Sequence, residues 1–325
     1  MSKRTVLLLL LIASAMFMTL QVALAIVLSM LAQTPYFAIS FAFIGLSGAG
    51  VYRYIRRREM PEQLSTEQLA TYFLAAGAIL ALATLIIKGM DLVQAQVIGD
   101  IILKSQSGEL EGHWLTILIL TTTSAAIIGF IFSLVFFSLG LTVTTIYDCY
   151  SQGAPRLYLF DLLGAAMGCI LGTYIYSILD PGSVFLVGVV TCFTVAGLLA
   201  WHASPRRLIA ISGAAIAVLM VLVNVTTGIF EIKPNTNFLA RVWSGKSTAT
   251  EIWSGWNAYS RVGLLRVQPK GSVKPPQYIF SINQAAGHAL ASPYRPSVAE
   301  EPLLEENIQP SDLAFLLGTP NRALV

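Results

Sequence analysis

Residues 157–172, LYLFDLLGAAMGCILG, form an apolar run with one carboxylate near its start and glycine at every fourth position. With its neighbours up to residue 178, the run is long enough to cross a bilayer as a helix. Four-residue spacing places Gly164, Gly168 and Gly172 on one face, where the missing side chains let a second helix approach closely. We therefore expect these glycines to pack against another helix.

Six further apolar runs accompany this one, and 55% of the 325 residues are hydrophobic while only 11% are charged. A typical soluble domain has about 25% charged residues. The first run follows a basic start, like a signal peptide, but it is too long for one and predicts a retained helix. We predict an all-α polytopic membrane domain over residues 1–228, with about seven transmembrane helices at 5–31, 37–55, 68–88, 115–143, 157–178, 183–201 and 207–225.

The loops between these runs differ in charge, and short basic loops stay in the cytoplasm. If the N-terminus is cytoplasmic, Lys88 and Lys104 are the only basic residues of these loops that lie outside. The nine basic residues on the inner side are then Lys3, Arg4, Arg53, Arg56, Arg57, Arg58, Arg156, Arg206 and Arg207. We expect an integral protein of the bacterial inner membrane with a cytoplasmic N-terminus, and the loop 89–114 outside.

The carboxylate in the opening stretch, Asp161, admits two interpretations. It is either an interfacial group hydrogen-bonded to a neighbouring helix, or an intramembrane polar site for a proton or a cation. The small-residue segment GLSGAG, 45–50, is a candidate partner for the glycine face. Small-residue faces of this kind also allow a homo-oligomer within the lipid bilayer.

The sequence contains no pattern typical of nucleic-acid binding, metal binding or catalysis. The net charge of +3 is too small to suggest nucleic acid as a partner. The three histidines are scattered and the three cysteines lack CxxC spacing, so we expect free thiols and no metal site. We identify no catalytic residue and no cofactor-binding residue.

The chain changes character after residue 228. Residues 229–300 read as a small β-rich region, with strands expected at 259–267 and 277–283 between proline- and glycine-containing loops. Residues 301–325 contain a linker, a short helix in SDLAFLLG and the start of a strand, NRALV. The fold class is thus a helical membrane domain followed by a short, incomplete α/β soluble tail with a small β-sheet.

Two segments resemble a known family. YLFDLLGAAMGCILG and the downstream WNAYSRVGLLRV are similar to motifs of spermidine synthase-like membrane proteins, which fuse transmembrane helices to a polyamine aminopropyltransferase-type domain. The resemblance implies that residues 301–325 open a Rossmann-like domain, and that a full-length relative takes decarboxylated S-adenosylmethionine as co-substrate. The glycine-rich nucleoside-binding loop and its acidic residues do not occur before Val325, and Asn283 and Gln284 replace the usual turn acid.

We therefore expect a membrane-anchoring N-terminal module of such a protein, truncated before the nucleoside-binding loop, not catalytically competent as given and without a cofactor of its own. Seven spans with a cytoplasmic N-terminus send the tail outside, although the family's substrates are cytoplasmic, and the sequence leaves this conflict open. The alternatives are a small-solute transporter or channel-like membrane protein, and a structural scaffold. Transport predicts polar residues deep in the bundle, whereas anchoring predicts an apolar, tightly packed interior.

Overall fold

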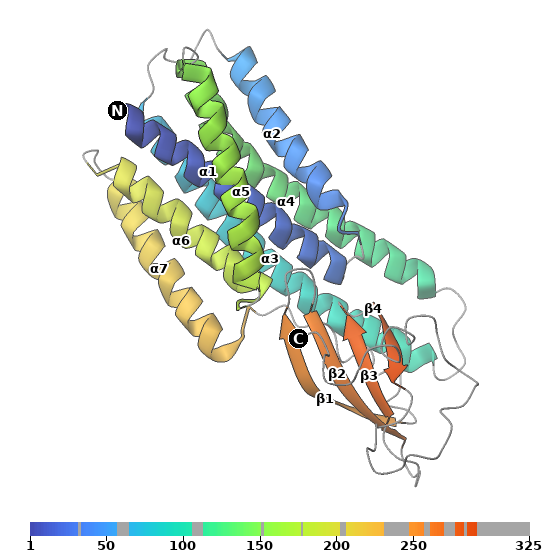
Figure 1. The fold of residues 1–325 in the computed structure, drawn as a ribbon. Helices are drawn as coiled ribbons and strands as arrows, with labels where there is room; N and C mark the ends of the chain where they lie inside the picture. Colours follow the sequence, from blue (N-terminus) through green and yellow to red (C-terminus); the bar gives the residue numbers. More distant parts are fainter. Residues whose placement is uncertain are drawn as a thin grey trace, which may run out of the picture.

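Seven helices run alternately in opposite directions through one bundle (Figure 1). The computed structural model describes residues 1–31, 34–56, 65–105, 113–150, 153–176, 178–201, 206–230, 247–256, 261–269, 277–282 and 285–290. The helices are α1 (Lys3–Leu31), α2 (Phe37–Ile55), α3 (Thr66–Ser105), α4 (His113–Cys149), α5 (Ala154–Tyr176), α6 (Pro181–Leu199) and α7 (Arg206–Thr227).

Each of the seven helices is long and apolar enough to cross a membrane. The prediction of a polytopic helical membrane protein is confirmed at this level. We call the end at which α1, α3, α5 and α7 begin the N-terminal end of the bundle, and the other the opposite end. Because the number of described spans is odd, the last residues of α7 lie at the opposite end from Met1 (Figure 1).

Helices α3 and α4 are longer than the sequence suggested. The segment expected as a loop from residue 89 onward continues α3 as far as Ser105, in one helix of 40 residues. A lone Gly89 costs only about 1 kcal/mol in a helix interior and does not end it. The first loop residues expected after α4 are likewise helical, because nothing between 144 and Cys149 breaks the helix.

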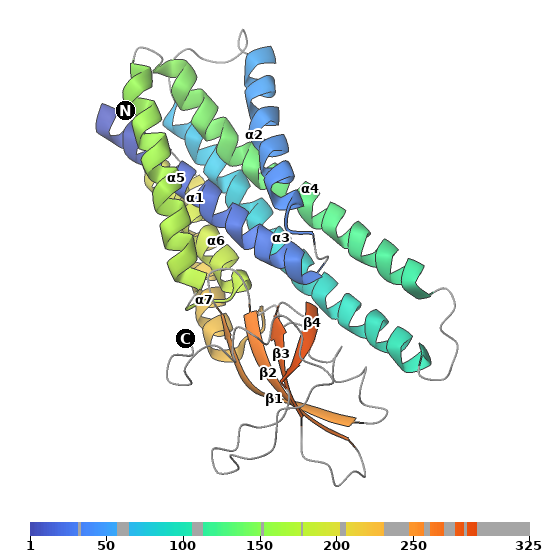
Figure 2. The same ribbon diagram turned by 45° about the vertical axis from the view of Figure 1, so that its right-hand side comes forward.

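Aromatic side chains fill the centre of the bundle, where α1, α4 and α6 meet. The rings of Phe17 and Phe136 have centroids 4.7 Å apart, and those of Phe132 and Phe185 lie 4.9 Å apart. Helix α1 packs against α2, α4, α5 and α6. Helices α2, α5 and α7 lie at the periphery, as the turned view shows (Figure 2).

A four-stranded antiparallel sheet follows the helices, with the strands in sequence order. The strands are β1 (Ser247–Trp256), β2 (Arg261–Pro269), β3 (Gln277–Ile282) and β4 (Ala285–Leu290). Strands β2 and β3 overlap the two segments expected to be extended, while β1 and β4 were not predicted. The helix and strand expected within 301–325 lie outside the described residues.

Candidate functional site

Asp161 lies where three helices meet near the N-terminal end of the bundle. Its carboxylate accepts a hydrogen bond from the Ser14 hydroxyl of α1, and a second from the Tyr147 hydroxyl of α4 at 3.1 Å. Ser14 is buried and Asp161 is half-buried. One carboxylate on α5 therefore ties α1 and α4 together through its two oxygens.

The glycine face of α5 lies directly against the backbone of α1. A Cβ atom on Gly168 would lie 2.8 Å from the Ala15 Cα, and one on Gly164 would lie 3.0 Å from the Leu11 Cα. Real Cβ atoms are essentially never found below 3.0 Å, so these positions leave little or no room for a side chain. A Cβ on Gly172 would be 3.7 Å from the Thr19 Cα, which is an ordinary contact.

Hydrogen bonds run along the same α1–α5 seam. The Thr19 hydroxyl donates to the Gly168 carbonyl at 3.0 Å, and the Tyr176 hydroxyl donates to the Thr19 carbonyl at 3.1 Å. Together with the Ser14–Asp161 bond, they hold the two parallel helices in one register. Close backbone approach and interhelical hydrogen bonds are the interactions that stabilise helix pairs in lipid.

The small-residue segment of α2, the candidate partner of the α5 glycines, packs elsewhere. A Cβ on Gly45 would lie 2.9 Å from the Phe137 amide nitrogen of α4, and one on Gly140 would lie 2.9 Å from the Ala49 Cβ. The expected α2–α5 pairing is therefore wrong, because α1 covers the α5 glycines and α4 covers this face of α2. Both faces are occupied within one chain, so a homo-oligomer would need other surfaces.

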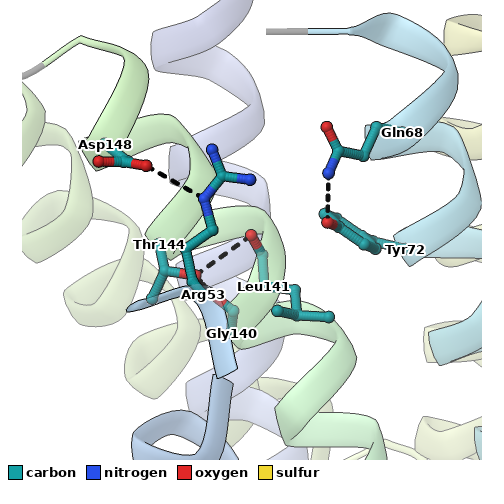
Figure 3. A network of polar contacts seen from close by, with 7 residues as sticks. All are labelled: Arg53, Gln68, Tyr72, Gly140, Leu141, Thr144 and Asp148. Carbon is teal, nitrogen blue, oxygen red and sulfur yellow. Dashed lines mark hydrogen bonds and ion pairs between the residues drawn. The ribbon is translucent and has the colours of Figure 1, made fainter. Parts of the chain in front are cut away.

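A partly buried ion pair joins α2 to α4 at the same end of the bundle (Figure 3). The Arg53 Nε donates to an Asp148 carboxylate oxygen at 3.1 Å, and the Arg53 and Asp148 side chains are 7% and 25% exposed. Figure 3 shows the guanidinium reaching from α2 toward the end of α4. Tyr147 and Asp148 are consecutive, so the last turn of α4 is bonded to α5 through one residue and to α2 through the next.

A second polar cluster lies at the opposite end, where α6 begins and α7 ends. The Asp180 side chain caps α6 by accepting hydrogen bonds from the Gly182 and Ser183 amides at 2.8 and 3.2 Å. The buried Asn224 of α7 donates to the Ser183 hydroxyl at 2.7 Å and accepts from the Phe230 amide at 2.5 Å. This cluster fixes the position at which the chain leaves the bundle.

Charged side chains of the described spans are confined to the two ends of the bundle. At the opposite end, Lys88 pairs with Asp91 on α3 at 2.9 Å. In the intervening section the hydroxyls of Thr84, Ser133 and Ser138 bond to backbone carbonyls of their own helices. Among the described residues there is no group of three or more His, Cys, Asp or Glu that could hold a metal ion. The arrangement can hold helices in place, and the polar cluster on Asp161 links three of them.

Sequence patterns singled out Asp161 and the glycines but missed the residues that contact them. Tyr147 and Asp148 had been placed in a loop, and Ser14 lies 147 residues before its partner. The only local signal in α1 is the small-residue sequence ASA at 13–15, in the segment that faces the α5 glycines.

Comparison of the chain with protein-family models, with curated proteins and with solved structures gives no match in any of the three.

Proposed function

We propose that the helical part of this chain is the membrane-anchoring module of a spermidine synthase-like protein of the bacterial inner membrane. The resemblance of the α5 stretch to that family's membrane motif suggests the family. The observation that carries the anchoring role is the packing of that stretch, whose glycines lie against the α1 backbone while Asp161 bonds to α1 and α4. These contacts hold α5 in one position.

The distribution of charge supports anchoring over transport. In the seven membrane-spanning segments of the described part, the Asp, Glu, Lys and Arg residues lie within about two turns of an end of their segment. Solute transporters place polar binding groups near the bilayer midplane, often where a helix is broken. The described spans are continuous helices.

A small-solute transporter or channel is the alternative function, and two observations favour it. Asp161 lies inside a span and is half-buried. The hydroxyls of Thr142 and Thr145 on α4 are buried without a hydrogen-bond partner in the described part. Buried polar groups of this kind are features of ion pathways.

A flux assay separates the two functions. The purified chain is reconstituted into sealed liposomes, and the movement of protons, potassium and a labelled diamine is compared with that in protein-free liposomes. We expect no difference, because the charged residues of the described spans lie near the ends of those spans. A flux that Asp161→Asn abolishes, with the protein still inserted, would contradict the anchoring role and favour transport.

A binding assay and a membrane-extraction assay also test the anchoring role. We expect no saturable binding of decarboxylated S-adenosylmethionine in isothermal titration, because residues 230–325 contain neither the family's glycine-rich turn nor the acidic residues that follow it. A fluorescent protein joined after Val325 should stay with the membranes through alkaline carbonate extraction. Micromolar binding, or release of the reporter by carbonate, would each contradict the proposal.

We further propose that the N-terminus is cytoplasmic, from the basic side chains at the N-terminal end of the bundle. On a background without native cysteines, Tyr36→Cys at the opposite end should react with an impermeant maleimide in spheroplasts, since Tyr36 is 80% exposed. Ser2→Cys, also exposed, should react only after lysis. The reverse pattern of labelling would show that the orientation is inverted.

A further inference from the structure

An arginine pair and a tryptophan lie together at the N-terminal end of the bundle, between α6 and α7. The Arg207 guanidinium carbon lies 3.9 Å from the centroid of the Trp201 ring, which is a cation–π geometry. Trp201 is half exposed, and the neighbouring Arg206 has an Nη1 atom 3.8 Å from a carboxylate oxygen of Glu67 on α3. Both side chains of that ion pair are largely exposed, at 47% and 58%.

This geometry suits a phosphate group. Stacking on the indole face orients the Arg207 guanidinium and leaves the N–H groups at its edge available, and a planar guanidinium can bind phosphate oxygens in a bidentate manner. The Arg206–Glu67 contact is long and exposed, so it holds Arg206 only weakly. The positive end of the α7 dipole, at Arg206, adds to the attraction for an anion.

The charge around the pair is also favourable to an anion. Two of the three described carboxylates at this end have other partners, Asp148 with Arg53 and Asp161 with two hydroxyls. Glu67 is the described carboxylate that competes for the arginine pair. The basic side chains of the described residues at this end are Lys3, Arg4, Arg53, Arg56, Arg156, Arg206 and Arg207.

The surroundings indicate that the phosphate belongs to a lipid. Helices α6 and α7 are both candidate membrane spans, and exposed aliphatic side chains lie close in sequence to Trp201 and the arginine pair. Leu198 is 67% exposed and Leu208 is 73% exposed, so acyl chains have an apolar surface directly beside the arginines. Tryptophan is enriched at the depth of the lipid headgroups, which is where Trp201 lies if α6 spans the bilayer.

We propose that Trp201, Arg206 and Arg207 bind the headgroup of an anionic phospholipid. The shared chemistry is that of a phosphate ester, and the apolar surface of α6 and α7 selects the lipid over a soluble phosphate. The site does not depend on the anchoring role or on which side of the membrane the N-terminus lies.

The test is a lipid titration of the purified chain in detergent. Dioleoyl phosphatidylglycerol or dioleoyl phosphatidylcholine is added at increasing mole fraction, and the thermal unfolding temperature is followed. We expect phosphatidylglycerol to raise this temperature at lower mole fractions than phosphatidylcholine. Arg206→Gln combined with Arg207→Gln should raise the mole fraction of phosphatidylglycerol at the midpoint of this titration about tenfold or more. The reason is that basic residues near anionic lipid each contribute several-fold to binding.

Control variants distinguish a specific lipid site from a general effect of positive charge. Lys3→Gln with Arg4→Gln removes the same charge from exposed positions at the same end and should leave the midpoint nearly unchanged. Glu67→Gln should lower the midpoint, because it removes the competing carboxylate. If the double arginine variant does not fold, Trp201→Leu provides a second test, with a smaller shift in the same direction.

Three outcomes would overturn the proposal. Equal losses in the Arg206/Arg207 and Lys3/Arg4 variants would mean diffuse electrostatic attraction and no site. Equal stabilisation by phosphatidylglycerol and phosphatidylcholine would exclude recognition of anionic lipid. Stabilisation by glycerol 3-phosphate that matches the lipid, and is lost in the arginine variant, would assign the site to a soluble phosphate ester.

Discussion

Replacing Gly168 with alanine should destabilise the helix bundle, whereas the same change at Gly172 should not. The added Cβ at 168 would lie 2.8 Å from the Ala15 Cα and closer still to the Ala15 carbonyl oxygen, so α1 and α5 must separate. Overpacking of this kind typically costs about 1–3 kcal/mol. At Gly172 the nearest neighbour would be the Thr19 Cα at 3.7 Å, so alanine fits.

The pair is informative because helix propensity acts in the same direction at both positions. Alanine is favoured over glycine by about 1 kcal/mol in a helix interior, so Gly172→Ala should be neutral or mildly stabilising. We expect Gly168→Leu to be worse than Gly168→Ala, since the larger side chain also forces the Thr19–Gly168 hydrogen bond apart. The measurement is retention of the monodisperse peak in size-exclusion chromatography after heating in detergent.

Similar melting curves for Gly168→Ala and Gly172→Ala would show that the seam can widen without cost. The close α1–α5 contact would then not be what holds α5 in place. A large loss in both variants would instead point to a general sensitivity of α5 to substitution, unrelated to the approach of α1.

The positions of the helices were predictable because apolar runs of sufficient length are separated by prolines and charges. The ends of α3 and α4 were not, and the expected spans stop at 88 and 143, before Asp91 and Asp148. Within a helix these charges are satisfied by Lys88 at i−3 and by Arg53 on another helix. Charges paired in this way do not carry the full cost of exposure to lipid, so the helix continues through them.

The glycine stripe was predictable from its spacing, but its partner was not. Close packing requires small residues or accessible backbone on the second helix, and the segment of α2 around Gly45 meets that condition as well as α1 does. What selects α1 is long-range: Ser14 and Thr19 supply hydrogen bonds to Asp161 and to the Gly168 carbonyl. These partners are almost 150 residues apart, and the spacing of residues in a single sequence does not predict contacts at that separation.

Removing the Asp148 carboxylate should cost more stability than removing its arginine partner. Asp148→Ala leaves the Arg53 side chain, which is only 7% exposed, without this acceptor inside the protein. Breaking a buried ion pair from one side costs about 3–5 kcal/mol, and we expect about 3 kcal/mol here because Asp148 itself is a quarter exposed. Arg53→Met leaves a carboxylate that can reach water, so its cost should be about 1 kcal/mol.

The double variant Arg53→Met/Asp148→Leu decides whether the pair acts as a unit. Replacing both partners with apolar side chains removes the buried charge together with its acceptor, and such exchanges are often close to neutral. The double variant should therefore be more stable than Asp148→Ala, with a coupling free energy between the two sites in a double-mutant cycle. Additive losses in the cycle, or equal losses for the two single variants, would show that Arg53 is held by other contacts and that the bond to Asp148 does not set the position of α4 against α2.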